Sequence, residues 1–143
     1  MNKFWAIRLL GIAMMLGMAP ACLAAGSWVA NAPSVAVAVP GRVTSSEALS
    51  AANPSRLAGR QVSEVSWRFR LPSDRALRAW LCQGSECLSL TSTRGRRTAP
   101  MSWQAGSELH FRFLLPNGQR RAVKVEGLQV IVNYRNRGAS SVK

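Results

Sequence analysis

The residues of this chain that could do chemistry are few, and two of them stand close together in the segment 81-LCQGSECLSL-90. Cys82 and Cys87 are separated by four residues, whereas thiol oxidoreductases use a C-x-x-C spacing. A structural zinc site needs four ligands, and the only histidine is His110. The segments on either side of 83-QGSE-86 have the pattern of two strands joined by a turn-rich connection. We therefore predict a disulfide that fixes the register of one hairpin and contributes about 2 kcal/mol, because the closed loop is short.

No catalytic set accompanies the cysteines. The 6 acidic residues are scattered along the chain, and the sequence contains no nucleophile, phosphate-binding or calcium-binding motif. His110 stands alone in an alternating segment, where a surface position is the ordinary interpretation. The sequence therefore predicts a protein that is not an enzyme and that has no cofactor and no metal site.

The N-terminal segment has the three-part layout of a secretory signal peptide. A basic start precedes an apolar run and then small residues. The run is shorter than the roughly 20 residues that a membrane span needs. We expect residues 1–25 to be removed by cleavage after Ala24 or Ala25, which leaves an exported chain without a transmembrane segment. Lipidation of Cys22 is the disfavoured alternative, because Ala-Pro-Ala before it lacks a large apolar residue.

The chain is strongly basic. Its 19 lysines and arginines and 6 acidic residues give a net charge of +13, or +11 once Lys3 and Arg8 leave with the signal. Such a balance attracts polyanions. Export makes nucleic acid an unexpected partner and leaves anionic lipid, envelope glycan and acidic proteins. A solvated surface that gives solubility alone is an equally good interpretation.

Alternating apolar and polar residues predict short strands along most of the chain. The pattern is found in the segments 28–39, 65–71, 77–82, 87–91, 109–115, 123–126 and 128–135. We interpret residues 40–61 as a long loop that has room for a short edge strand or a single helical turn near residues 46–51, and residues 91–100 as a basic loop. No segment predicts a helix of three turns. The fold class that follows is all-β: an antiparallel β-sandwich, or partly open barrel, of six to eight short strands. We expect a single domain over residues 26–136 and a flexible tail over 137–143.

Arginines gather in segments that we expect to be loops, and loops carry function more often than strands do. The candidate partner-binding arginines are Arg94, Arg96, Arg97, Arg120 and Arg121. If these loops lie at one end of the sandwich, their side chains form one basic patch. Solvated loop charge is the alternative.

Several features together resemble one protein family. They are the AAG that ends the signal with Trp28 close behind, 67-WRFRL-71, 81-LCQGSECLSL-90 and 129-QVIVNYR-135. In this order they resemble the flagellar FlhE proteins, small exported proteins of Gram-negative bacteria. The resemblance implies a periplasmic β-sandwich without enzymatic activity that acts as an accessory or chaperone-like factor in flagellum assembly. It also implies a role in limiting proton leak through the export gate.

The resemblance further implies that Cys82 and Cys87 form the family's disulfide and that 130–135 is its C-terminal strand. We hypothesise that the protein contacts a flagellar rod or export-gate component through loops or through an exposed sheet edge, where a partner could add a strand. The C-terminal strand is the first candidate edge. Its candidate residues are Val130, Val132, Tyr134 and Arg135. The alternative is a basic module that binds anionic lipid or glycan in the envelope.

Overall fold

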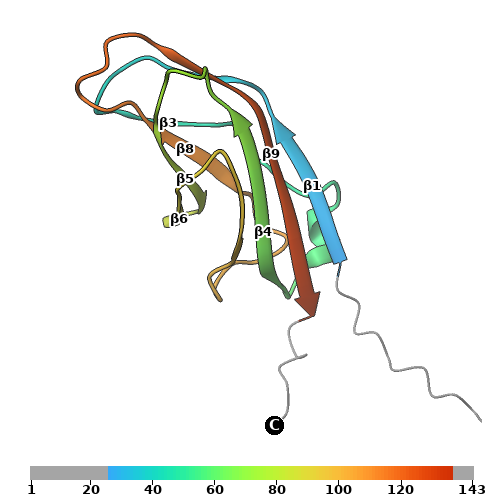
Figure 1. The fold of residues 1–143 in the computed structure, drawn as a ribbon. Coiled ribbons are helices and arrows are strands. Elements are labelled where there is room, and N and C mark those ends of the chain that lie inside the picture. The colour runs from blue at the N-terminus through green and yellow to red at the C-terminus, as the bar shows by residue number, and fades with distance from the viewer. Residues whose placement is uncertain (1–25, 137–143) are drawn as a thin grey trace, which may run out of the picture.

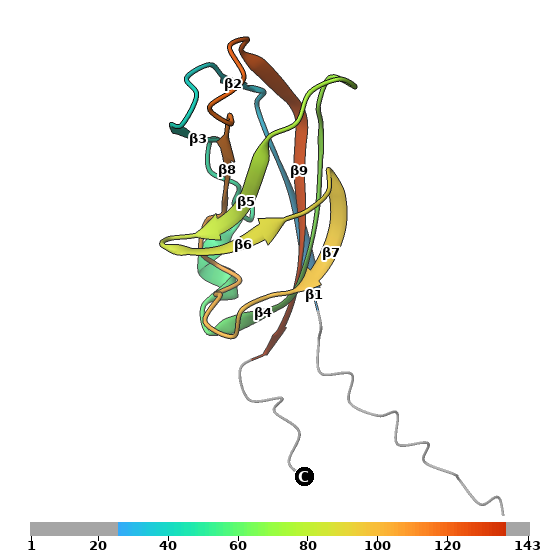
Figure 2. The ribbon, with the colours of Figure 1, turned by 60° about the vertical axis from the view of Figure 1, so that its left-hand side comes forward.

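The computed structural model describes residues 26–136, so the expected signal peptide, its cleavage site at Ala24 or Ala25, and the tail 137–143 lie outside the described residues. The described residues form two antiparallel sheets packed face to face, and the predicted all-β sandwich is confirmed (Figures 1 and 2). Within this range the structure has nine strands and one short 3-10 helix, η1 (Pro54–Leu57).

The larger sheet is built around its two longest strands. β4 (Arg60–Arg70) and β9 (Val123–Asn136) lie side by side at its centre (Figure 1). β1 (Gly26–Ala32) and β2 (Val35–Val37) pair with the other side of β9. β7 (Arg94–Thr98) pairs with the free side of β4 and forms the opposite edge of the sheet.

The smaller sheet has the order β3-β8-β5-β6. Its strands are β3 (Val43–Ser45), β8 (His110–Leu114), β5 (Arg78–Gln83) and β6 (Glu86–Leu90). The hairpin of β5 and β6 is the one that the cysteine segment predicts. Gly84 is the first residue of its two-residue turn and has φ +58°, a conformation that glycine adopts without strain.

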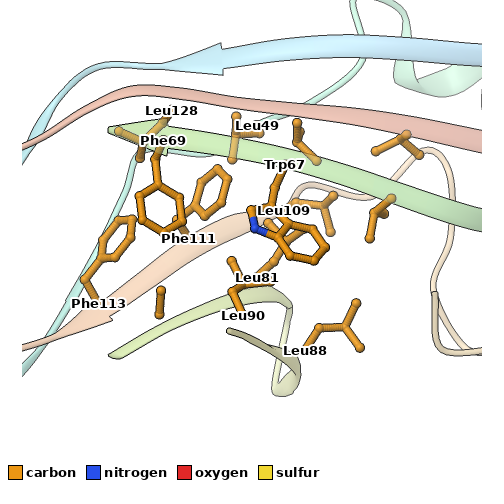
Figure 3. Packing of buried hydrophobic residues seen from close by; sticks show 14 of the residues in the cluster. Leu49, Trp67, Phe69, Leu81, Leu88, Leu90, Leu109, Phe111, Phe113 and Leu128 are labelled. Atoms are coloured by element: carbon orange, nitrogen blue, oxygen red, sulfur yellow. The ribbon is translucent and has the colours of Figure 1, made fainter. Parts of the chain in front are cut away.

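The core lies between the sheets and is supplied by the apolar positions of the alternating segments. Phe69 of β4 faces Phe111 and Phe113 of β8, with ring centroids 6.0 and 5.4 Å away and edge-to-face orientations (Figure 3). Phe111 and Phe113 stack on each other at 5.9 Å. This aromatic cluster joins the two sheets and holds β4 in place, so the neighbouring edge strand β7 is attached to a fixed support.

The segment 28–39 shows where one expected strand becomes two. β1 ends at Ala32 and β2 begins at Val35, with Pro33 between them. Proline has no main-chain N–H, so pairing with β9 is interrupted there. The expected loop 40–61 is largely irregular, but it contains β3, η1 and a bridge between Leu49 and Leu109.

Candidate functional site: the basic edge of the larger sheet

The sequence of the basic segment 91–100 predicts a loop, but the structure places the edge strand β7 within it. β7 runs antiparallel to β4, with Arg94 opposite Arg68 and Thr98 opposite Glu64. Charged side chains are common on edge strands, because they discourage pairing with other chains. The expectation of a loop is therefore wrong at residues 94–98, and the arginines stand on a rigid element.

Main-chain hydrogen bonds fix which groups of β7 face β4. The N–H of Phe69 donates to the oxygen of Thr93 at 2.9 Å, and the N–H of Ala99 donates to the oxygen of Ser63 at 3.1 Å. Because bonded and non-bonded pairs alternate in an antiparallel ladder, residues 93, 95, 97 and 99 turn their main-chain groups toward β4. Three intervening residues turn theirs toward the open edge of the sheet: Arg94, Arg96 and Thr98.

Side chains on β7 alternate between the two faces of the sheet. Gly95 lies directly over the buried ring of Trp67, and a Cβ atom at Gly95 would be 2.5 Å from Cζ2 of that ring. The side chains of Arg94 and Arg96 therefore project from the outer face, away from the core. Both are exposed.

Arg97 behaves differently from its two neighbours in sequence. Its Nη1 donates to the main-chain oxygen of Ser89, at 2.9 Å, on the edge strand of the smaller sheet. β6 and β7 lie on the same side of the sandwich, so this hydrogen bond links the edges of the two sheets (Figure 2). The structure thus separates Arg97, which bridges the sheets, from Arg94 and Arg96.

A groove runs along the outer face beside β7. Two neighbouring hollows, of about 480 and 370 Å³, share Arg68 and Arg94 in their linings. Gln129 and Ile131 of β9 also line the larger hollow, and Ile131 is 36% exposed. We call this surface the arginine groove and define it by four residues: Arg68, Arg70, Arg94 and Arg96.

The positive charge of the arginine groove is only partly balanced by the protein's own carboxylates. Within residues 26–136, an ion pair is recorded for one of the four arginines, between Arg96 Nε and Glu64 at 3.3 Å. The two side chains are 71% and 35% exposed, so the pair adds little stability and competes weakly with an outside anion. Glu126 lies opposite Arg70 in the ladder but pairs with Lys124, at 3.4 Å.

The C-terminal segment 130–135 does not offer an edge. β9 pairs with β4 along this whole segment and with β1 on its other side as far as Tyr134. Val130 and Val132 are both 0% exposed and belong to the core. The expectation of strand addition is therefore wrong for residues 130–134, because their hydrogen-bonding positions are already occupied within the sheet.

Tyr134 and Arg135 lie near the end of the same strand. Tyr134 is half-buried, with Gly26 against its ring and the Arg60 guanidinium 5.5 Å from the ring centroid. Arg135 is exposed and lies opposite Gln61. Neither lines the arginine groove.

Arg120 and Arg121 belong to a different surface. They line a hollow of about 310 Å³ with Asp74, Arg75 and Gln119, in the connection between β8 and β9 and the facing connection between β4 and β5. Arg75 donates to Gln119 Oε1 at 3.2 and 3.3 Å, which ties the two connections together. This hollow shares no lining residue with the arginine groove, so the predicted arginines do not form one patch.

The two cysteines form the predicted disulfide. Cys82 and Cys87 lie opposite each other in the hairpin with a Cα separation of 4.0 Å. The Arg112 guanidinium donates to the oxygen of Gly84 at 3.2 Å and so helps to hold the turn. Neither cysteine carries a free thiol in this state.

Other reactive groups remain dispersed in three dimensions. Within residues 26–136 no group of three or more histidine, cysteine or acidic side chains is placed to hold a metal ion. His110 Nδ1 lies 3.2 Å from the main-chain oxygen of Ser46, and its Nε2 lies 3.8 Å from Glu108. In the part of the chain that the structure describes, no helix is long and apolar enough to span a lipid bilayer.

Fold and surface together define a small antiparallel β-sandwich protein with a disulfide-closed hairpin and a strongly basic sheet edge. The model of the family "Flagellar protein FlhE" matches residues 34–135. The chain belongs to the FlhE family of flagellar proteins.

Individual relatives agree with this assignment. The chain is 35% identical to the flagellar protein FlhE of Salmonella typhimurium over 114 residues, which cover 77% of this chain and 85% of the relative. It is 30% identical to FlhE of Yersinia enterocolitica over 119 residues, which cover 79% and 84%. A solved structure, titled "Crystal Structure of FLHE", has a TM-score of 0.66 and 33% identity, and the match covers 78% of this chain and 98% of that chain.

Proposed function

We propose that this protein is a non-enzymatic accessory factor of flagellum assembly that works in the periplasm and binds a component of the flagellar rod or export gate. Membership of the FlhE family supports the flagellar part of this proposal. The sequence of residues 1–25 supports export, because it has the layout of a cleaved signal with Ala24 or Ala25 at its end.

One observation carries the binding part of the proposal: the arginine groove lies beside a strand edge that has no partner among residues 26–136. Arg94 and Arg96 present their side chains on the outer face and their main-chain groups at the edge. Proteins often recognise extended segments by adding them to such an edge. Arg120 and Arg121 offer a second, smaller basic surface at one end of the sandwich.

The experiment that tests the assembly role is electron microscopy of flagella in a strain that lacks this gene, beside its parent and a strain with the gene restored. Filaments that are trapped or misassembled in the periplasm are the expected result, and restoration of the gene should correct them. Normal flagella and normal motility in the deletion strain would contradict the proposal.

A finer role in limiting proton leak through the export gate follows if the bound component belongs to the gate. The cytoplasmic pH of the deletion strain should then fall faster after external acidification than that of the parent. A strain that lacks both this gene and the export gate is the control, and its pH should behave like that of the parent. An equal rate of acidification in all strains would remove this role and leave the assembly role in place.

The strongly positive net charge, +13 for the whole chain and +11 without Lys3 and Arg8, favours one alternative, a module that binds anionic lipid or glycan in the envelope. On this hypothesis, vesicles that contain anionic lipid should bind the protein at low salt and release it as the salt concentration rises. Neutral vesicles should not bind it. Tight binding to anionic vesicles, combined with normal flagella in the deletion strain, would put this alternative first.

A further inference from the structure

We infer that the edge of β7 binds an extended acidic segment of a partner protein, which adds to the larger sheet as a sixth strand with its carboxylates in the arginine groove. This inference rests on the proposed function for the identity of the partner. It goes further in naming the site and the chemistry of the segment.

The main chain of β7 has the groups that strand addition requires. The main-chain groups of Arg94, Arg96 and Thr98 point away from β4, and among the described residues β7 has no other strand partner. A strand of 5 residues rises about 17 Å, at roughly 3.4 Å per residue, so a short extended segment can pair along its whole length. The support is rigid, because β4 is fixed by its neighbour β9 and by the core.

The charge of the groove selects the side chains of the segment. A strand added next to β7 would lie about 4.8 Å away, and every second side chain would point to the outer face. These side chains would stand beside Arg94 and Arg96, at the distance of cross-strand neighbours. Carboxylates at these positions can form charge-assisted, bidentate hydrogen bonds with the guanidinium groups.

The same arrangement argues against a second copy of this chain as the occupant. If two β7 strands paired with each other, the arginines at 94 and 96 of one copy would face those of the other. Like charges directly opposite each other destabilise a sheet. The edge is therefore closed to self-association and open to a segment of opposite charge.

A flat anionic surface fits the observations less well than an extended polypeptide does. Lipid headgroups would use the arginines but not the main-chain groups of Arg94, Arg96 and Thr98. An acidic extended peptide uses both the arginine side chains and these main-chain groups.

The test uses a capped peptide of about seven residues in which valine and glutamate alternate, and isothermal titration calorimetry with the purified protein at low salt. We expect saturable binding by the wild-type protein. The double variant Arg94→Glu/Arg96→Glu should bind at least tenfold more weakly, and the neutral variant Arg94→Gln/Arg96→Gln should fall between the two. Arg120→Glu/Arg121→Glu makes the same change in net charge outside the groove and should bind within about twofold of the wild type.

Two further measurements separate strand addition from simple charge attraction. A peptide of the same sequence whose main-chain amides are all N-methylated keeps its charge but cannot donate hydrogen bonds to β7, and it should bind much more weakly. Hydrogen exchange of the Arg96 and Thr98 amides should slow when the alternating peptide is bound, because these N–H groups become donors to it.

Several results would overturn the inference. They are an absence of binding, an equal loss of binding in both Arg→Glu double variants, equal binding of the N-methylated peptide, and unchanged exchange at Arg96 and Thr98. Anionic vesicles that bind through the groove arginines more tightly than the peptide does would replace it with a lipid-binding surface. None of these results depends on the flagellar phenotype of the deletion strain, so failure of this inference and failure of the proposed function are distinguishable.

Discussion

β9 and β7 flank the same strand, β4, and they differ in almost every other property. β9 has 14 residues, pairs on both sides and places four valines and one leucine in the core. β7 has 5 residues, pairs on one side, and three of its residues are arginines. The segment with the clearest strand pattern is therefore structural, while the segment that resembles a loop offers the open edge.

The difference shows how one sheet can separate stability from recognition. Burial of apolar side chains along β9 supplies free energy of folding, and this requires that its main-chain groups be paired internally. An edge strand contributes less to the core and keeps free main-chain groups, which charged side chains protect from unwanted pairing. We expect mutations in β9 to change stability and mutations in β7 to change binding.

The largest expected effect concerns the two faces of β9. Leu128 is 1% exposed, and Leu128→Ala should lower the free energy of unfolding by about 2–5 kcal/mol, because it leaves a cavity in the core. Ile131→Ala on the outer face of the same strand is the matched control and should cost less than about 1 kcal/mol. Urea denaturation followed by tryptophan fluorescence measures both. Equal losses would mean that the outer face of β9 is also covered.

A smaller effect is expected where β7 crosses the buried Trp67. Gly95→Val introduces a Cβ atom 2.5 Å from the Trp67 ring, so β7 must shift or the ring must move. Overpacking of this kind costs about 1–3 kcal/mol. Gly118→Ala is the control, since nothing lies within 4 Å of a Cβ atom at that position. A Gly95→Val variant with unchanged stability and unchanged peptide binding would show that β7 is not held against β4 as described.

The smallest effect distinguishes the arginines of β7 from one another. Arg97→Ala removes the hydrogen bond to the oxygen of Ser89 and should lower the free energy of unfolding by about 1 kcal/mol. Arg94→Ala removes no hydrogen bond between the sheets, so its free energy of unfolding should stay within about 0.5 kcal/mol of the wild type. The same substitution should weaken binding of the acidic peptide. Thermal denaturation and calorimetry measure the two properties separately. The reverse pattern would exchange the roles of these residues.

The sequence predicts those parts of the fold in which period-2 alternation coincides with burial. The segments around Trp67, Phe111 and Val125 become strands, and the cysteine segment becomes a stapled hairpin. The strand β7 is missed because its sequence, RGRRT, has no apolar residue. No apolar side chain is required at its inner position, because Gly95 lies against the ring of Trp67 there. Alternation of apolar and polar residues arises from burial of one face of a strand, so a strand that is barely buried shows little alternation.

The candidate site could be predicted only in part for a related reason. Arg94 and Arg96 can be named as candidates from charge alone. Their different orientation from Arg97 follows from the alternation of side chains along β7, and the sequence does not predict that this segment is a strand. Arg68 and Arg70 are visible as the polar positions of an alternating segment, yet their meeting with β7 depends on strand order. Strand order is also what places residues 130–135 inside the sheet, and no local pattern encodes it.

The measurement that tests the account most directly is electron microscopy of flagella in the deletion strain that carries either of two variants, expressed at the level of the wild-type protein. Arg94→Glu/Arg96→Glu changes the arginine groove, and Arg120→Glu/Arg121→Glu makes the same change in charge elsewhere. We predict that the groove variant fails to restore normal flagella and that the other variant restores them. Restoration by both variants, or failure of both, would contradict the claim that the β7 edge is the partner-binding surface.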